Sequence, residues 1–310
     1  MINQATEFSV IITCLNEQQS IIEFHSRLDK ALRDLGRTFE IIFVNDGSGD
    51  ETFSLLKSLF HQNPNVRVVL DLFKNSGQAA AITAGIVEAQ GKHFIFMDSD
   101  LQLDPEELPQ LVAEFDRGAD VVSGFRKIRH DAIGRRVFSK LANSIMRVAS
   151  GTQFTDFGCT YKIFRGQLLR AFEYGPSRRF YPVEVISRAR RCVETPVTHH
   201  PRRYGRSGWT FMRLFDFNME NIIHIPVRPF QLLIILTFLV ASLLVVRIFA
   251  SMFLDFKILG DVTGGLLLNM LLIMFLVGVG ILAFIGELVI RSFQNLQRAP
   301  KYIIREALRR

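Results

Sequence analysis

Cysteine and tryptophan are scarce in this chain of 310 residues, which has three cysteines and one tryptophan. Cys14, Cys159 and Cys192 form no CxxC pair, which excludes a disulfide framework and is typical of a reducing compartment. GxGxxG and Walker sequences are also missing, so neither a dinucleotide-binding fold nor a P-loop is indicated. Only 22% of the residues are charged and 48% are hydrophobic, with a mean hydropathy of +0.20. An ordinary soluble enzyme has less apolar content than this.

Charge is unevenly distributed along the sequence. Residues 1–116 contain 8 Lys and Arg against 18 Asp and Glu, whereas residues 117–228 contain 21 against 8. The formal net charge of +7 therefore hides an acidic first third and a basic middle. Because a nucleic-acid binder usually presents a continuous basic face, we expect no nucleic-acid partner.

Two long runs contain no charged residue, Phe230–Val246 and Gly264–Gly286. Each approaches or exceeds the roughly 20 residues that cross a bilayer. We predict transmembrane helices at 229–254 and 262–290; a buried helical hairpin in a soluble core is the alternative. Basic residues flank the outer ends of the two runs, so the positive-inside rule places both termini in the cytosol and the protein in the cell (inner) membrane.

Amphipathic segments adjoin the two runs. Residues 211–228 show helical spacing of apolar side chains and predict a helix in the headgroup layer. The basic tail, 291–310, is expected to be cytosolic and juxtamembrane, and its sequence YIIREALRR could lie at the membrane in the same way. Packing against the preceding domain is the alternative for both segments. No leader sequence is recognisable at the N-terminus, so residues 1–210 are predicted to form a cytosolic domain.

The first hundred residues alternate short apolar runs with amphipathic stretches. This pattern predicts β-α-β units, an α/β fold and a mainly parallel sheet, in which ligands bind beyond the carboxyl ends of the strands. Asn, Asp and Glu side chains follow three of the predicted strands. The predicted strands are FSVIITCL, EIIFVND, VRVVLDL and HFIFMDSD, and the predicted helices are 21–36, 51–62 and 77–90.

The sequence Asp98-Ser99-Asp100-Leu101-Gln102 follows the fourth strand. Alternate carboxylates and an amide oxygen are hard ligands that suit Mg²⁺ or Mn²⁺, and such an ion neutralises a diphosphate. An ordinary solvated turn is the alternative, because acidic pairs are common at strand ends. Asp104 next to Pro105 predicts a helix N-cap.

Four ordered motifs resemble family 2 glycosyltransferases of the GT-A fold. They are SVIITCLNE, FVNDGSGDET, KNSGQAAAITAGIVEAQG and FMDSDLQLDPEE. TDFGCTYKIFRG, RRYGRSGW and the two apolar runs narrow the resemblance to polyprenyl-phosphate glycosyltransferases, similar to bactoprenol glucosyltransferase and dolichyl-phosphate mannose synthase. The resemblance implies inverting transfer of a sugar from a nucleotide diphosphate sugar to a membrane isoprenoid phosphate.

The resemblance also assigns donor-side residues. Asp98, Asp100 and Gln102 match the divalent-metal motif, and Asp100 matches a catalytic position as well. The family usually has Pro where Thr13 stands and an aromatic residue where Leu15 stands. These differences leave open whether the nucleoside of the donor is uridine or guanosine. The positions that match nucleotide-sugar-binding residues are Thr13, Leu15, Glu17, Val44, Asp46, Asp98 and Ser99.

A lipid phosphate must approach an anionic diphosphate, so the acceptor side needs cations. Arg126 matches both a catalytic and an acceptor-side position, and attraction of basic residues to anionic lipid is the alternative for the basic middle. Asp156 matches an acidic position near the acceptor. A phosphate monoester is largely dianionic at neutral pH, so we expect Asp156 to orient the acceptor or the sugar rather than to remove a proton. The matching acceptor-phosphate residues are Arg126, Arg135, Arg136, Ser139, Arg203 and Arg206.

Other functions fit less well. A processive polysaccharide synthase would show a QxxRW sequence and more apolar runs. A mannosyltransferase using GDP-mannose stays open, as does a non-catalytic scaffold or flippase subunit. The donor is expected to be UDP-glucose or a related UDP-sugar and the acceptor undecaprenyl phosphate. Glycines in the second apolar run would allow homo-oligomers, and His199 and His200 are expected at a solvated strand end.

Overall fold

The structure, a computed structural model, describes residues 6–126, 144, 146, 147, 151–204, 263–296 and 299–310. The chain forms two compact units, one of Met1–Ile225 with Ala299–Arg310 and one of Pro226–Arg298. The predicted helix at 211–228 and the predicted span at 229–254 lie outside the described residues.

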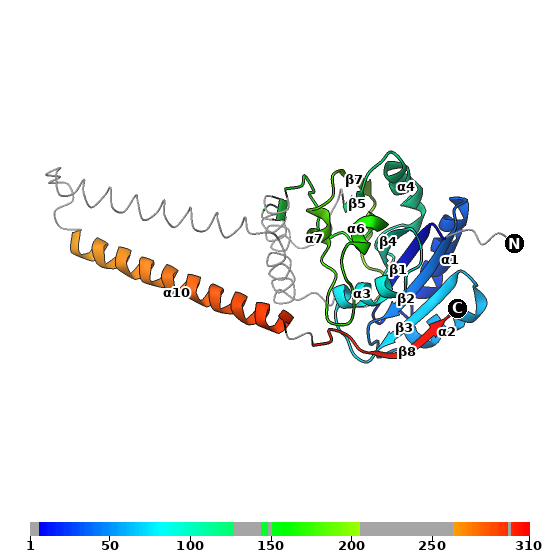
Figure 1. Ribbon diagram of the computed structural model, residues 1–310, viewed down its shortest axis with the longest axis horizontal. Helices are drawn as coiled ribbons and strands as arrows, with labels where there is room; N and C mark the ends of the chain where they lie inside the picture. Colours follow the sequence, from blue (N-terminus) through cyan, green and yellow to red (C-terminus); the bar gives the residue numbers. More distant parts are fainter. Residues whose placement is uncertain (1–5, 127–143, 145, 148–150, 205–262, 297–298) are drawn as a thin grey trace. The chain divides into compact units, whose positions relative to one another are not determined.

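Within the described part of the first unit, eight strands form one sheet in the order β7-β5-β6-β4-β1-β2-β3-β8 (Figure 1). β1 pairs in parallel with β2 and β4, β2 with β3, and β5 with β7, whereas β6 and β8 run antiparallel to their neighbours. The prediction of an α/β fold with a mainly parallel sheet is confirmed. The strands are β1 (Phe8–Cys14), β2 (Phe39–Asn45), β3 (Val66–Leu72), β4 (His93–Asp98), β5 (Val121–Arg126), β6 (Lys162–Arg165), β7 (Cys192–Val197) and β8 (Ile304–Arg309).

Helices cover both faces of this sheet. Along β1, Val10 and Ile12 join one buried cluster and Ile11 joins the other, because successive side chains of a strand point to opposite faces. The first cluster includes apolar residues of α1, α2 and α4, and the second includes those of α3, α6 and α7. The helices of this unit are α1 (Ile21–Asp34), α2 (Thr52–Gln62), α3 (Gln78–Glu88), the 3-10 turn η1 (Pro105–Glu107), α4 (Leu108–Asp116), α6 (Gly166–Arg170) and α7 (Pro182–Ile186).

The interfacial helix predicted as one possibility for the C-terminal tail is wrong. Ile304–Arg309 is strand β8, paired antiparallel with β3, and Tyr302 just before it is buried. Without β8, strand β3 would be the edge of the sheet, with unpaired backbone groups along one side. Backbone pairing with this edge therefore competes with helix formation in the tail, and the alternative of packing against the first domain holds.

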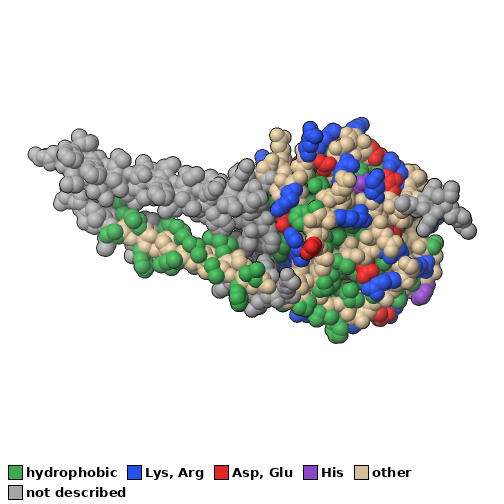
Figure 2. Space-filling view, in the orientation of Figure 1, with side chains coloured by type: hydrophobic (Ala, Val, Ile, Leu, Met, Phe, Trp, Pro, Cys, Tyr) green, Lys and Arg blue, Asp and Glu red, His purple; other side chains and the backbone are tan. Residues whose placement is uncertain are grey.

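In the second unit the described element is α10 (Thr263–Leu296), which contains the predicted helix 262–290 apart from its first residue. Among the side chains of α10 that the structure describes, several large apolar ones are exposed, including Leu271, Phe275, Leu282 and Phe293 (Figure 2). Among the residues that the structure describes, no helix is long and apolar enough to span a membrane.

Candidate functional site

The carboxyl ends of three parallel strands bring the predicted donor residues to one edge of the sheet. Thr13 on β1 is the register partner of both Val44 on β2 and Asp98 on β4. The segments that follow these strands leave from that edge, as expected for a ligand site in an open parallel sheet. Glu17 and the Asp98–Gln102 segment therefore belong to one region of the fold.

Asp98 ends β4 with both carboxylate oxygens occupied. Its Oδ1 accepts a hydrogen bond from Gln78 Nε2 at 2.5 Å, and its Oδ2 accepts one from Thr160 Oγ1 at 2.8 Å. Burial, and then the neighbouring Asp100 carboxylate, raise the pKa of Asp98 above its ordinary value. Ser99 is buried, and its hydroxyl donates to the Thr13 carbonyl at 3.1 Å, which ties β4 to β1 at the site.

Asp100 and Glu17 share an arginine. Arg202 Nη2 lies 2.9 Å from Asp100 Oδ2 and 3.5 Å from Glu17 Oε1. Burial raises the pKa of Glu17 to about 7, although Ser20 donates to its Oε2 at 2.6 Å. The other oxygen of Asp100 accepts the backbone N–H of Gln102 at 3.2 Å. A guanidinium thus balances carboxylates that desolvation would otherwise disfavour.

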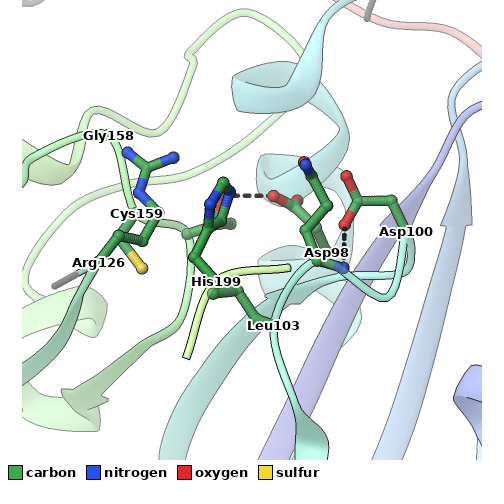
Figure 3. A pocket seen from close by; sticks show the side chains of 9 residues that line it. Asp98, Asp100, Leu103, Arg126, Gly158, Cys159 and His199 are labelled. Carbon is green, nitrogen blue, oxygen red and sulfur yellow. Dashed lines mark hydrogen bonds between the residues drawn. The ribbon is translucent and has the colours of Figure 1, made fainter. Parts of the chain in front are cut away.

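A small cavity of about 30 Å³ opens beside these carboxylates. Figure 3 shows Asp98 and Asp100 at one side of it and Arg126 at the other. Gln102 and His199 also line it, so His199 is part of the site rather than only a solvated strand end. His200 instead contacts Asp104 through Nε2 at 2.7 Å. Asp104 is the N-cap residue of η1 and Pro105 opens the turn, as predicted, but the Asp104 side chain makes no capping bond and pairs with His200 and Arg27 instead.

The lining suits a hard divalent cation. Asp98, Asp100 and Gln102 present two carboxylates and an amide to the same cavity, which are oxygen-donor groups that Mg²⁺ and Mn²⁺ accept. Within the described ranges, no group of three or more His, Cys, Asp or Glu side chains forms a metal cluster. A cation here would complete its coordination with oxygen atoms of a ligand or of water.

The remaining residues predicted to bind the nucleotide sugar differ in how exposed their side chains are. Asp46 is buried, and its carboxylate accepts the backbone N–H groups of Ser76 at 2.7 Å and Gly77 at 3.0 Å, before α3. Burial raises its pKa to about 6. Val44 is fully buried in the core, so its side chain offers no surface to a base, and Leu15 is half-buried after β1. A nucleotide contact at Val44 or Leu15 stays a prediction.

Arg126 and Asp156 form a bidentate ion pair on the other side of the cavity. Nε and Nη2 of Arg126 each lie 2.7 Å from a carboxylate oxygen of Asp156. Both side chains are largely buried, and Glu194 on β7 accepts the backbone N–H of Asp156 at 3.0 Å. Gly158 leaves room for the guanidinium, because a Cβ there would lie 3.2 Å from Arg126 Nη2. This pairing holds Arg126 in a fixed orientation at the cavity.

Of the other predicted acceptor residues the structure describes Arg203, which does not line the cavity. Arg203 is mostly exposed and lies 3.5 Å from Glu23 on α1. Its neighbour Arg202 reaches the donor carboxylates instead. Arg135, Arg136, Ser139 and Arg206 lie outside the described residues.

Four residues of the site were not predicted from the sequence: Gln78, Thr160, His199 and Arg202. The motifs quoted for the family resemblance contain three of these residues, but no role was assigned to them. Gln78 lies in KNSGQAAAITAGIVEAQG, Thr160 in TDFGCTYKIFRG and Arg202 in RRYGRSGW. For His199 the sequence shows no partner at metal spacing and so indicates no role. Its neighbours in the cavity come from strands distant in sequence.

Comparison with known proteins identifies the family. The model of glycosyl transferase family 2 matches residues 9–173. The chain is 34% identical over 313 residues to undecaprenyl-phosphate 4-deoxy-4-formamido-L-arabinose transferase of Klebsiella pneumoniae subsp. pneumoniae, covering 97% of this chain and 93% of that protein. It is also 34% identical to the protein of the same name from Pseudomonas fluorescens, covering 97% and 90%.

A solved structure shares the fold. Glucosyl-3-phosphoglycerate synthase from Mycobacterium tuberculosis, solved in complex with Mn²⁺, UDP and phosphoglyceric acid, superposes with a TM-score of 0.52 at 17% identity, covering 71% of this chain and 77% of that one. This likeness shows a GT-A-like α/β fold alone. From the family match and the curated relatives, the chain belongs to glycosyltransferase family 2 and is an enzyme of that family.

Proposed function

We propose that this enzyme transfers a sugar from a nucleotide diphosphate sugar to undecaprenyl phosphate, with inversion at the anomeric carbon. One observation carries the proposal: the oxygen donors Asp98, Asp100 and Gln102 line one cavity together with Arg126, which is held by Asp156. An anionic donor bound through a cation and an anionic acceptor bound through an arginine would meet there. The names of the curated relatives support this acceptor.

The donor side would bind the diphosphate. A bound Mg²⁺ or Mn²⁺ would neutralise the negative charge of the leaving diphosphate. Asp98, Asp100 and Gln102 would hold the ion, while Asp46 and Glu17 shape the loops proposed to bind the nucleotide. Arg202 would leave Asp100 or share it with the ion, since both compete for the same carboxylate.

The acceptor side would place the nucleophile. An oxygen of the lipid phosphate attacks the anomeric carbon, the bond from that carbon to the diphosphate oxygen breaks, and the nucleoside diphosphate departs with the electron pair. The attacking phosphate is largely dianionic at neutral pH, so no group need remove a proton. Arg126 would bind the phosphate, and Asp156 would orient Arg126. Arg135, Arg136, Ser139, Arg203 and Arg206 remain proposed acceptor contacts by their match to the family.

Three candidates are proposed for the sugar donor. A UDP-sugar such as UDP-glucose is the expectation from the motifs, and GDP-mannose is the alternative. The relatives at 34% identity favour 4-deoxy-4-formamido-L-arabinose as a further candidate, because that sugar stands in their names. The transfer assay below includes each of these donors.

We further propose attachment to the cell membrane through helices at 229–254 and 262–290, with both termini cytosolic. Support comes from the two uncharged runs and from the exposed apolar side chains of α10. The protein is expected to stay in the membrane pellet after extraction with alkaline carbonate, because apolar helices in hydrocarbon resist removal by high pH. Release into the supernatant would contradict the two spans.

The transfer reaction should depend on metal and on Asp100. With a panel of radiolabelled nucleotide sugars and undecaprenyl phosphate, the full-length protein is expected to label the lipid, and EDTA to abolish the labelling. Asp100→Asn should lower the rate about 100-fold or more, because a metal ligand is lost. Asp116→Asn removes an exposed carboxylate at the end of α4 that pairs with Arg37, and should leave the rate unchanged. No metal-dependent labelling with any donor would refute the proposed function.

Asp156→Asn should lower turnover while leaving donor affinity within about twofold. Asparagine cannot form the bidentate ion pair, so Arg126 loses its orientation, and such misplacement costs roughly 10- to 100-fold in rate. Steady-state kinetics with varied donor, together with calorimetric UDP binding, separate the two effects. Asp120→Asn breaks another carboxylate–arginine pair, with Arg165, and serves as the control. Wild-type turnover in Asp156→Asn would show that the ion pair has no positioning role.

Stability should fall as pH rises through the neutral range. The folded protein raises the pKa of Glu17 to about 7, so it favours the protonated carboxyl. The resulting stability is complete below the ordinary pKa of about 4.5 and is lost as the pH passes about 7. Glu17→Gln should reduce the decrease in unfolding free energy from pH 4.5 to pH 7.5 by about 1 kcal/mol or more, measured by urea denaturation. Glu23→Gln, at a half-exposed carboxylate on α1, should keep the wild-type decrease. An unchanged decrease in Glu17→Gln would remove Glu17 as its cause.

A further inference from the structure

The C-terminal strand carries an arginine that pairs with a fully buried carboxylate. Asp71 on β3 is 0% exposed, and Arg305 Nε on β8 donates to its Oδ2. A buried carboxylate is costly unless a charge and hydrogen bonds compensate it, and removal of one partner leaves the other uncompensated. Compensation of this buried carboxylate therefore depends on a residue that follows α10 in the chain.

Asp71 passes this constraint to the end of β2. Its Oδ1 accepts a hydrogen bond from Asn45 Nδ2 at 2.7 Å, and Asn45 is itself fully buried, directly before Asp46. Because a carboxylate only accepts, it fixes the Asn45 amide with its NH₂ group toward β3 and its oxygen away from it. That oxygen accepts the hydroxyl of Ser48 at 2.5 Å.

Ser48 joins the two loops at the donor side of the site. Its Oγ accepts the backbone N–H of Asn16 at 2.9 Å, and Asn16 Oδ1 accepts the backbone N–H of Gly49 at 2.9 Å. Asn16 has a φ of 56°, a left-handed conformation that needs support from its surroundings. Asn16 and Ser48 thus join the loop after β1 to the loop after β2, next to the bonds that Glu17 and Gln18 make with Thr52 and Asp50.

We propose that Arg305 is a positioning residue for nucleotide binding. It acts through Asp71, Asn45, Ser48 and Asn16 on the loops 15–20 and 46–51, and it couples the strand that follows α10 to the donor side. The proposal rests on the proposed function to the extent that these loops hold the nucleotide. The hydrogen-bonded path itself does not depend on that function.

The same strand supplies a matched control. Arg309 also lies on β8 and is half-exposed like Arg305, and its guanidinium binds both carboxylate oxygens of Glu88 on α3 at 2.7 and 2.8 Å. Glu88 ends α3, and the Arg309 ion pair does not enter the path to Asn45 and Ser48. Arg305→Gln and Arg309→Gln therefore remove comparable charges from one strand, only one of which is linked to the loops.

Hydrogen exchange of the full-length protein tests the path without any substrate. Amides in the peptides that cover 15–20 and 46–51 should exchange faster in Arg305→Gln than in the wild type or in Arg309→Gln. The peptide covering 108–116 on α4 reports general destabilisation and should not change. Adding Asp71→Asn to Arg305→Gln should restore slow exchange, because the buried charge is then gone and the amide oxygen can still accept from Asn45.

Kinetics tests the consequence for the donor. Arg305→Gln should raise KM for the nucleotide sugar about fivefold or more, as typical coupling between sites does, with kcat changed less than twofold. Arg305→Lys should recover part of this loss by keeping the charge. Loop exchange and KM equal to those of Arg309→Gln, or equally faster exchange in α4, would overturn the proposal. Absence of all transfer by the wild-type protein would refute the proposed function instead, and the exchange result would still decide the path.

Discussion

Negative charge concentrated at the carboxyl ends of the parallel strands is the constraint on which the site depends. Glu17, Asp46, Asp98 and Asp100 stand at or just beyond the carboxyl ends of β1, β2 and β4, where burial raises the pKa of the first three. Backbone N–H groups, neutral side chains and the Arg202 guanidinium offset this charge within the protein. A cation entering the cavity would find oxygen donors already assembled, so part of the electrostatic cost of binding is met during folding.

On the opposite side of the cavity, the charge that must be held in place is positive. Arg126, which is proposed to bind a phosphate, is held by the carboxylate of Asp156, which limits its motion but also neutralises part of its charge. Glu194 holds the backbone of Asp156 in turn. On both sides of the cavity, a charged side chain is therefore kept in place by a side chain of opposite charge. The acidic first third and basic middle of the sequence reflect this division.

Local pattern was enough to predict the strands and helices between residues 8 and 98, because apolar periodicity and buried β-branched residues identify each element separately. The site was predictable where a motif follows a strand, as at Asp98 and Asp100. The sequence did not predict the roles of Arg202, His199 and β8, because these roles arise from contacts with residues far away in sequence. The tail has the composition of an amphipathic helix, and only the open edge of β3 makes it a strand. Asp104 precedes Pro105 at the predicted cap position, but its carboxylate binds Arg27 and His200 instead of the backbone of η1.

Strand β8 has a topological consequence. β1 to β4 precede residues 205–298 in the chain and β8 follows them, yet all five belong to one hydrogen-bonded sheet. Members of one sheet cannot lie on opposite faces of a bilayer. Any crossing of a bilayer between residues 205 and 298 therefore occurs an even number of times, whatever the distribution of flanking charge. If the proposed spans cross a bilayer, the backbone pairing of β3 with β8 would set the parity of the topology, and a single-span anchor would be incompatible with it.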